Sequence, residues 1–337
     1  MNRLKPRMPW SPQLLFFLIV LNLGWLVSPP SGWSQEEKLP VSARRPVDFS
    51  AFGQVRYTDY SSNGTDTFSL RRVRLALASS VLPSLDFKVQ IEQTKAISLV
   101  EAYLSFHLSR YLEFRAGQYK VPFSYENLKS ASEQDFINRS SVVETLCPGR
   151  DIGSQGRDIG VTLWLHSAAI EAAVGLFNGS GINRLDNDDH KDKAFRFTLS
   201  PLRGLTIGGS WYEGLWPENQ NASSRLRRRQ GLEAQLRSGS LTINGEYIFA
   251  QNYDQKAAGW VIQVNLLLRQ GRIQPVVRFE SLDQDRAVKD NEAEAWTVGI
   301  NFHFAPRTKL QINRESRLLK PETKRQNVYL VQFQIGF

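Results

Sequence analysis

The sequence contains little that could support a metal centre, a disulfide framework or catalysis. It has 337 residues and a single cysteine, Cys147, which excludes an intramolecular disulfide and a cysteine-based zinc cluster. The four histidines (His107, His166, His190 and His303) are not spaced as metal ligands. No activated nucleophile with a positioned base is recognisable. We therefore expect neither an enzyme nor a cofactor.

Long apolar runs are equally scarce. Residues 14–27 form the only one, and fourteen residues are too few to cross about 30 Å of hydrocarbon as a helix. A basic stretch without acids precedes this run, and small residues follow it up to Ser34. The pattern is that of a secretory signal peptide rather than a membrane anchor. We expect residues 1–34 to be cleaved and residues 35–46 to form a short polar linker.

Helical periodicity is nearly absent beyond residue 47, and strict alternation takes its place. Trp296, Val298 and Ile300, for example, alternate with Thr297 and Gly299. One face of such an extended segment is apolar and the other polar, as in a half-buried strand. About sixteen segments show the pattern, at residues 47–60, 66–82, 85–95, 97–108, 111–122, 157–166, 168–178, 192–200, 204–214, 228–237, 240–251, 258–269, 272–283, 293–305, 308–317 and 327–337.

The connections between these segments alternate in length. Seven are tight, near residues 83–84, 109–110, 167, 201–203, 238–239, 270–271 and 306–307, whereas those between them tend to be longer and polar. Short turns at one end, long loops at the other and an even strand count are typical of an outer-membrane barrel; a soluble sandwich usually has shorter strands. The sequence therefore predicts an all-β fold, a transmembrane antiparallel β-barrel of about 16 strands over residues 47–337. Lipid offers no hydrogen bonds, so the barrel must close.

The chain ends on an alternating strand whose last residue is aromatic. Tyr329, Val331, Phe333, Ile335 and Phe337 share one face. This ending looks like the signal recognised by the bacterial barrel-assembly machinery, which is therefore an expected partner through Phe337. Together with the signal peptide and the alternation, it predicts a location in the bacterial outer membrane, with outer-membrane lipid around the barrel.

The lumen-facing positions, assigned by alternation, carry charges of both signs. Rings of Arg and Lys in a pore select anions, and an arginine fork fits phosphate or carboxylate oxygens. The alternative is a solvated wall whose charges pair across neighbouring strands. The inward bases are Arg56, Arg72, Arg74, Lys88, Arg115, Arg196, Arg237, Arg278 and Lys309; the inward acids are Glu92, Glu101, Glu113, Glu171, Glu233, Glu246 and Glu280.

Residues 123–156 form the longest segment without alternation. Loops of this length are usually functional. The loop follows the fifth strand, where it is well placed to fold inward and narrow a pore, although an outward surface loop is the alternative. Lys129, Ser130 and Ser132 within it could hydrate a passing anion. The acidic loop at residues 179–191 could hold calcium, but it is more readily explained as a solvated loop.

The chain resembles the phosphate-selective porin O and P family of Gram-negative outer membranes. The most distinctive similarity is Gly-Gln-Tyr-Lys-Val-Pro-Phe at residues 117–123. Further matches are residues 68–75, 100–104, 115–126, 150–153, 175–179 and 186–188. The resemblance implies a sixteen-stranded trimeric channel whose third loop enters the lumen, and an arginine ladder with a lysine cluster that draws phosphate to a narrow site. By motif, the constriction would hold Arg71, Arg72 and Glu101.

One motif departs from the family pattern. Phosphate-specific members carry lysines that flank a serine pair in the third loop, whereas here only Lys129-Ser130-Ala131-Ser132 is found, followed by Glu133. This departure argues against strict phosphate specificity and for a more general passage of anions or small solutes. The candidate pathway residues are Arg71, Arg72, Arg74, Glu101, Arg115, Lys120, Lys129, Ser130, Ser132, Arg196 and Arg278.

The sequence therefore predicts a passive, anion-preferring porin for phosphate or related oxyanions, assembled as a homotrimer. Two alternatives stay open: a non-selective porin, since inward acids nearly balance inward bases, and a closed structural or adhesive barrel. Lys and Arg outnumber Asp and Glu by 42 to 33, but the arginines are spread over alternating strands instead of forming one patch. We therefore expect no nucleic acid partner.

Overall fold

The computed structural model describes residues 46–337, except residues 62–63, 95, 187 and 217–225. The expected signal peptide (1–34) and all but the last residue of the expected linker (35–46) lie outside the described residues. In the described part, no helix is long and apolar enough to span a membrane.

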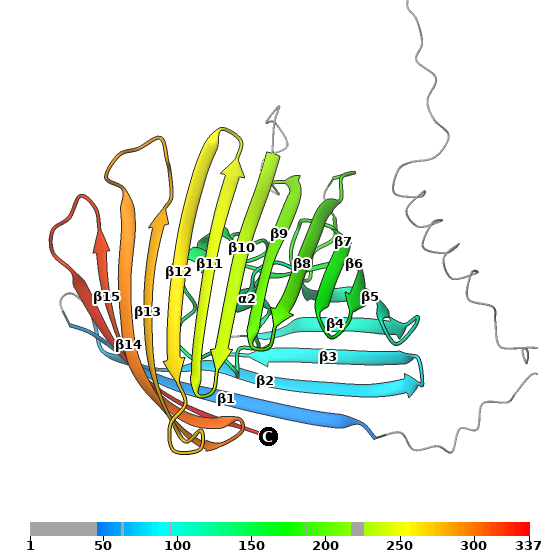
Figure 1. The fold of residues 1–337 in the computed structure, drawn as a ribbon, viewed down its shortest axis with the longest axis horizontal. Coiled ribbons are helices and arrows are strands. Elements are labelled where there is room, and N and C mark those ends of the chain that lie inside the picture. The colour runs from blue at the N-terminus through cyan, green and yellow to red at the C-terminus, as the bar shows by residue number, and fades with distance from the viewer. Residues whose placement is uncertain (1–45, 62–63, 95, 187, 217–225) are drawn as a thin grey trace, which may run out of the picture. The chain divides into compact units, whose positions relative to one another are not determined.

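Sixteen antiparallel strands form one closed barrel, which confirms the predicted fold class (Figure 1). Each strand pairs with its neighbours in sequence, and β1 pairs with β16 to complete the ring. The strands are β1 (Asp48–Tyr60), β2 (Thr67–Leu82), β3 (Leu85–Gln93), β4 (Ile97–His107), β5 (Leu112–Lys120), β6 (Arg157–His166), β7 (Ile170–Phe177), β8 (Asp192–Leu202), β9 (Leu205–Leu215), β10 (Leu226–Ser238), β11 (Leu241–Asn252), β12 (Gln255–Leu266), β13 (Ile273–Asp283), β14 (Glu292–Ala305), β15 (Thr308–Leu319) and β16 (Gln326–Gly336).

The seven tight turns all lie at the barrel end where β1 begins and β16 finishes. They comprise residues 83–84, 108–111, 167–169, 203–204, 239–240, 267–272 and 306–307. In outer-membrane barrels this short-turn end faces the periplasm. The opposite end carries most of the longer loops, but two of its links are short. β3 ends at Gln93 and β4 begins at Ile97. β11 and β12 extend further than alternation suggested and are joined by residues 253–254 alone, with Tyr253 in the left-handed region (φ 54°) that two-residue hairpins require.

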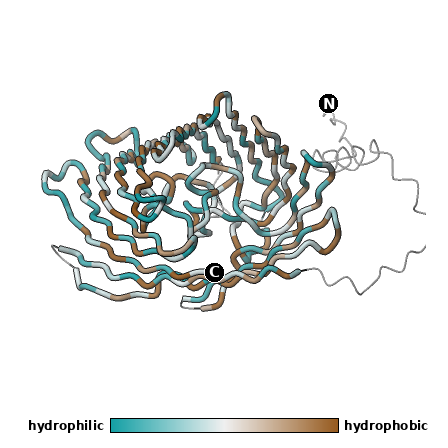
Figure 2. The backbone as a smooth tube through the Cα atoms, turned by 60° about the horizontal axis from the view of Figure 1, so that its bottom comes forward, coloured by the Kyte–Doolittle hydropathy of each residue, from teal (hydrophilic) through white to brown (hydrophobic). Residues whose placement is uncertain are grey.

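The two faces of the wall differ as alternation predicts. On β15, Gln311 and Asn313 are each 1% exposed, whereas Ile312 between them is 40% exposed on the outer face. Figure 2 shows the same change of hydropathy from one residue to the next along the wall. The apolar outer face suits lipid, and the polar inner face lines the lumen.

A long segment between β5 and β6 packs inside the ring. This inner loop, residues 121–156, contains the short helices α2 (Tyr125–Leu128) and α3 (Ser141–Leu146). Ser140 caps α3 by accepting a hydrogen bond from the Val143 backbone N–H. An apolar core cluster lies where Val142, Val143 and Phe123 of this loop meet residues of β5, β7, β8, β9, β11 and β13. Figure 2 shows chain inside the ring of strands.

Candidate functional site

The inner loop is attached mainly to one half of the barrel wall, from β10 round to β16. Side chains on the inner faces of β13, β14 and β15 bind its backbone directly. Lys309 Nζ donates to the Gln134 carbonyl at 2.5 Å, Asn301 Nδ2 to the Asp135 carbonyl at 2.8 Å, and Arg278 Nη1 to the Asn138 carbonyl at 2.9 Å. These bonds are specific side-chain contacts of the wall, so they fix where the loop lies across the lumen.

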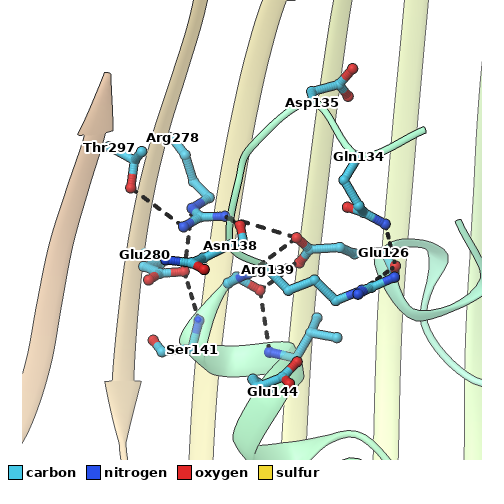
Figure 3. A network of polar contacts seen from close by, with 12 residues as sticks. Glu126, Gln134, Asp135, Asn138, Arg139, Ser141, Glu144, Arg278, Glu280 and Thr297 are labelled. Atoms are coloured by element: carbon cyan, nitrogen blue, oxygen red, sulfur yellow. Dashed lines mark hydrogen bonds and ion pairs between the residues drawn. The ribbon is translucent and has the colours of Figure 1, made fainter. Parts of the chain in front are cut away.

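Buried carboxylates hold the start of α3 against the same wall (Figure 3). Glu126 is 2% exposed and accepts from the Ser140 hydroxyl at 2.6 Å and from the Ser140 N–H at 3.1 Å. Glu280 of β13 accepts from the Ser141 N–H at 3.0 Å. Arg278 lies 3.9 Å from Glu126 and 3.6 Å from Glu280, and its guanidinium stacks over Phe136. Every charge of this group has a partner, as buried charges require.

A second anchor joins the end of the inner loop to β10. Asp151 accepts two hydrogen bonds from Arg227, at 2.5 and 3.0 Å, and one from Arg229 at 2.7 Å. Both arginines are at most 1% exposed, and Asp192 of β8 lies 3.6 Å from Arg227. One carboxylate on the loop therefore pairs with two arginines of the wall, and Asp192 supplies a second negative charge beside them.

The other half of the wall, from β2 to β7, borders a cavity of about 360 Å³. We call it the basic cavity because five cationic side chains and only two carboxylates line it. The lining residues are Arg74, Lys88, Gln90, Glu101, Tyr103, Arg115, Tyr119, Lys120, Leu128, Ser130, Arg157, Trp164, His166 and Glu171. Of the candidates predicted from sequence, the structure brings Arg74, Glu101, Arg115, Lys120 and Ser130 together here.

Glu101 lies between two cations of this cavity. Its carboxylate accepts from Lys88 Nζ at 2.9 Å and from Arg157 at 2.6 and 2.9 Å. Two cations thus share one acid, and the group keeps a net positive charge. Lys120 lies close by, and its ammonium donates to the carbonyls of Leu128 and Lys129, both at 2.9 Å.

Arg115, which also lines the cavity, stacks on aromatic rings. Its guanidinium lies 4.6 Å from the ring centre of Tyr103, 5.5 Å from that of Tyr119 and 5.8 Å from that of Trp164. Glu113 binds it at 2.7 Å. Stacking orients the planar fork while part of the side chain, 24% exposed, stays open to solvent.

A β-bulge rearranges the three arginines of β2. Strict alternation would place Arg71 on the face opposite Arg72 and Arg74. In the structure Gln54 pairs with Arg72 and Val55 with Leu70, so Arg71 is the extra residue. Its charged neighbours are Arg56, Glu144, Glu92 and Arg74, which all belong to the lumen. All three arginines therefore lie on the inner side of the barrel.

The remaining candidate residues lie in different parts of the lumen and have different partners. Lys129 binds Asp135 at 2.5 Å, and the hydroxyls of Ser130 and Ser132 bond each other at 3.0 Å. Arg196 is 6% exposed and bridges Glu171 at 2.6 Å to Glu233. Arg278 is 1% exposed beneath the inner loop and outside the basic cavity, where it holds the loop.

Sequence reasoning missed the Asp151 anchor. It placed Arg227 in a loop, because the predicted strand began at residue 228. The structure starts β10 at Leu226, which puts Arg227 and Arg229 on one inner face. The run Arg227-Arg228-Arg229 was the available signal, since two arginines at i and i+2 share a face of any strand. No metal-binding group of three or more His, Cys, Asp or Glu side chains occurs among the described residues.

Comparison with known proteins agrees with this architecture. Similar solved structures include an anion-selective porin from Comamonas acidovorans (TM-score 0.67, 13% identity, 87% of this chain and 100% of that chain), the trimer form of OmpT from Vibrio cholerae (0.63, 11%, 87% and 99%) and the outer-membrane channel DcaP of Acinetobacter baumannii (0.63, 9%, 88% and 98%). At these identities the similarity concerns the fold. No curated protein sequence matches the chain significantly.

A family model assigns the chain more specifically than the similarity of fold does. The model described as phosphate-selective porin O and P matches residues 47–249, which is more than half of the chain. The match covers β1 to β10 and most of β11, and with them the inner loop and the whole basic cavity. The fold and the family are those of a channel of the bacterial outer membrane rather than of an enzyme. The chain belongs to the phosphate-selective porin O and P family.

Proposed function

We propose that this porin is a passive channel with a preference for anions, and that phosphate or related oxyanions are its substrates. The observation that carries the proposal is the basic cavity. Five cations and two carboxylates leave a surplus of three positive charges beside the inner loop. Cationic linings of this kind select anions.

The arrangement of the cavity suits transient binding of an oxyanion. Arg115 presents a guanidinium fork, 24% exposed, which matches the oxygens of phosphate in pairs, and Lys88, 32% exposed, adds a point charge. The fork of Arg157 is buried against Glu101. Conduction also requires release. The Arg115 fork already has a carboxylate partner, Glu113, so an anion competes with that partner for the fork and leaves again.

The assembly is proposed by analogy. One similar structure, OmpT of Vibrio cholerae, is described as a trimer, and the family resemblance implies the same state here. We therefore propose a homotrimer. We also propose that the barrel-assembly machinery recognises the end of β16, where Phe337 is 69% exposed while its backbone pairs with Ala51.

The test is the reversal potential of the refolded protein in a planar bilayer across a potassium chloride gradient. We expect a reversal potential shifted towards the chloride equilibrium potential, and we expect added phosphate to block the current. Replacing two partly exposed cavity cations, in the double variant Lys88→Gln/Arg115→Gln, should shift the potential towards zero. The matched control Arg286→Gln/Lys289→Gln removes two exposed charges from the 284–291 loop and should leave the potential near the wild-type value.

One observation favours a non-selective porin as the second candidate. Most lumen arginines are paired, for example Arg74 with Glu92 at 2.6 Å and Arg196 with Glu171 at 2.6 Å. If pairing cancels the surplus, the reversal potential lies near zero in the wild type and in both variants. A folded barrel that passes no current would instead support the closed, structural barrel.

A further inference from the structure

The periplasmic turns have a charge of one sign. The seven turns defined above hold five arginines, Arg110, Arg203, Arg269, Arg272 and Arg307, and neither Asp nor Glu. All five are exposed, and no ion pair involves them among the described residues. The loop at residues 284–291, at the opposite end, instead carries two acids and two bases. The positive charge therefore marks the periplasmic edge of the barrel.

Exposed apolar side chains accompany these arginines. Tyr111 is 45% exposed beside Arg110, and Leu202 is 68% exposed beside Arg203. Phe304, at 64%, precedes the turn that holds Arg307. A cation next to an exposed apolar group suits the boundary between acyl chains and headgroups, where the stem lies in the apolar layer and the charge reaches the phosphates.

One place on this edge is hollowed. A cavity of about 610 Å³ lies between the turn at residues 267–272 and the end of β14. It is lined by Arg269, Gln270, Arg272, Ile273, Phe302, His303 and Phe304. Its lining combines two arginines with a largely apolar wall. Of its aromatic side chains, Phe304 is the most exposed.

The apolar wall of this cavity belongs to the lipid side of the barrel. Ile273 pairs with Phe302, and four residues further along the two strands Val277 pairs with Val298. Val277 and Val298 are 40% and 45% exposed on the outer face. Since positions an even number of residues apart share a face, Ile273 and Phe302 also point to lipid.

The turn that carries the two arginines has a defined backbone. Arg269 (φ 47°) and Gln270 (φ 57°) are both in the left-handed region, followed by Gly271 at 87°. Hydrogen bonds from the Gly271 N–H to the Leu268 carbonyl, at 3.0 Å, and between Leu268 and Ile273 close the turn. Tight β-hairpin turns require such left-handed residues, so the turn fixes where Arg269 and Arg272 leave the backbone.

We infer that this cavity binds an anionic phospholipid of the periplasmic leaflet. Arg269 and Arg272 would hold the headgroup phosphate, and an acyl chain would run along Ile273, Phe302 and Phe304. Charge complementarity and the apolar wall beside the charges argue for a lipid over a free ion, which would use the arginines alone. The site lies outside the lumen, so the inference does not depend on the proposed anion selectivity.

The test is a lipid titration followed by native mass spectrometry. The delipidated protein in detergent receives phosphatidylglycerol or phosphatidylcholine with the same acyl chains. We expect the first phosphatidylglycerol to bind on the order of ten-fold more tightly than phosphatidylcholine. The variant Arg269→Gln/Arg272→Gln should lose most of this preference, while Arg286→Gln/Lys289→Gln, which removes the same charge from the opposite end, should keep it.

Three results would overturn the inference: a wild type without preference, a turn variant that keeps it, or an equal loss in both variants. Displacement of phosphatidylglycerol by millimolar inorganic phosphate would also overturn it, because the arginines would then bind the anion without the apolar wall. Folding is checked by heat-modifiable gel mobility. If the double variant does not fold, Phe304→Ser can replace it. This variant leaves both arginines in place and should weaken the binding of both lipids alike. An unchanged reversal potential in the turn variant separates this site from the lumen.

Discussion

Replacing Asp151 with asparagine should release the inner loop from β10. The substitution keeps the shape of the side chain but removes the charge that Arg227 and Arg229 share through three hydrogen bonds of 2.5, 2.7 and 3.0 Å. Breaking a buried ion pair by removing one partner costs about 3–5 kcal/mol. Asp192 remains 3.6 Å from Arg227, and asparagine retains one acceptor oxygen, so we expect the lower end, about 3 kcal/mol.

The neighbouring pair provides the control. Arg228 lies between the two buried arginines and points to the other face, where it binds Glu213 at 2.6 Å with side chains 38% and 29% exposed. Exposed pairs contribute at most about 1 kcal/mol. Urea unfolding in detergent, followed by tryptophan fluorescence, should therefore separate Asp151→Asn clearly from Glu213→Gln. Equal losses for the two variants, or a loss below about 1 kcal/mol for Asp151→Asn, would refute the anchor.

The single cysteine gives a second readout of the same event. Cys147 is fully buried in the core cluster of the inner loop, and burial raises the pKa of its thiol. A buried, protonated thiol reacts slowly with maleimides or thiosulfonates. We expect no labelling of the folded wild type and rapid labelling of folded Asp151→Asn. Labelling of the wild type at the rate of the unfolded chain would contradict the packing of this loop.

Three further variants test the lumen and the wall. Glu101→Gln should increase chloride over potassium permeability in the reversal-potential assay, because it frees two cations of their shared acid. Lys120→Gln should reduce anion selectivity more than Lys129→Gln, because the Lys129 ammonium is already neutralised by the Asp135 carboxylate at 2.5 Å. Equal effects of the two variants would exclude a special role of Lys120. Gly117→Ala should destabilise the barrel by at least about 2 kcal/mol, because its φ is 131° and an added Cβ would lie 2.2 Å from a backbone carbonyl oxygen of β4. Gly245→Ala, whose nearest neighbour would be 4.0 Å away, should change stability by less than about 0.5 kcal/mol in the same urea titration.

The barrel was predictable from sequence because its main constraint acts locally. A strand between lipid and lumen must alternate at every step, so each strand carries its own signal. The short turns were equally predictable. The link between β14 and β15, for example, is the two residues 306–307, as predicted. The length of the link between β11 and β12 was harder to predict, because the polar residues near both strand ends resemble a loop.

The site was only partly predictable, because alternation gives the face of a residue but not what covers it. Arg115 and Arg278 have the same inward parity. One rests on aromatic rings in the basic cavity, and the other lies 1% exposed under the inner loop. The difference arises from contacts between residues more than a hundred positions apart, such as that of Arg278 with Asn138. The bulge at Arg71 was hidden for a related reason, since it depends on the pairing with β1.

The division of the wall explains how an arginine-rich lumen can be both stable and selective. On the half that holds the inner loop, arginines are shielded from water, so each must meet a carboxylate or a carbonyl, as Arg227, Arg229 and Arg278 do. Those charges stabilise the position of the inner loop and contribute little to the attraction of a passing ion. On the other half the basic cavity holds three more cations than carboxylates, and two of its cations, Lys88 and Arg115, keep 32% and 24% of their side chains exposed. Selectivity should therefore follow the balance of charge within the basic cavity, and it should respond to Glu101 and Lys120 far more than to the net charge of the chain.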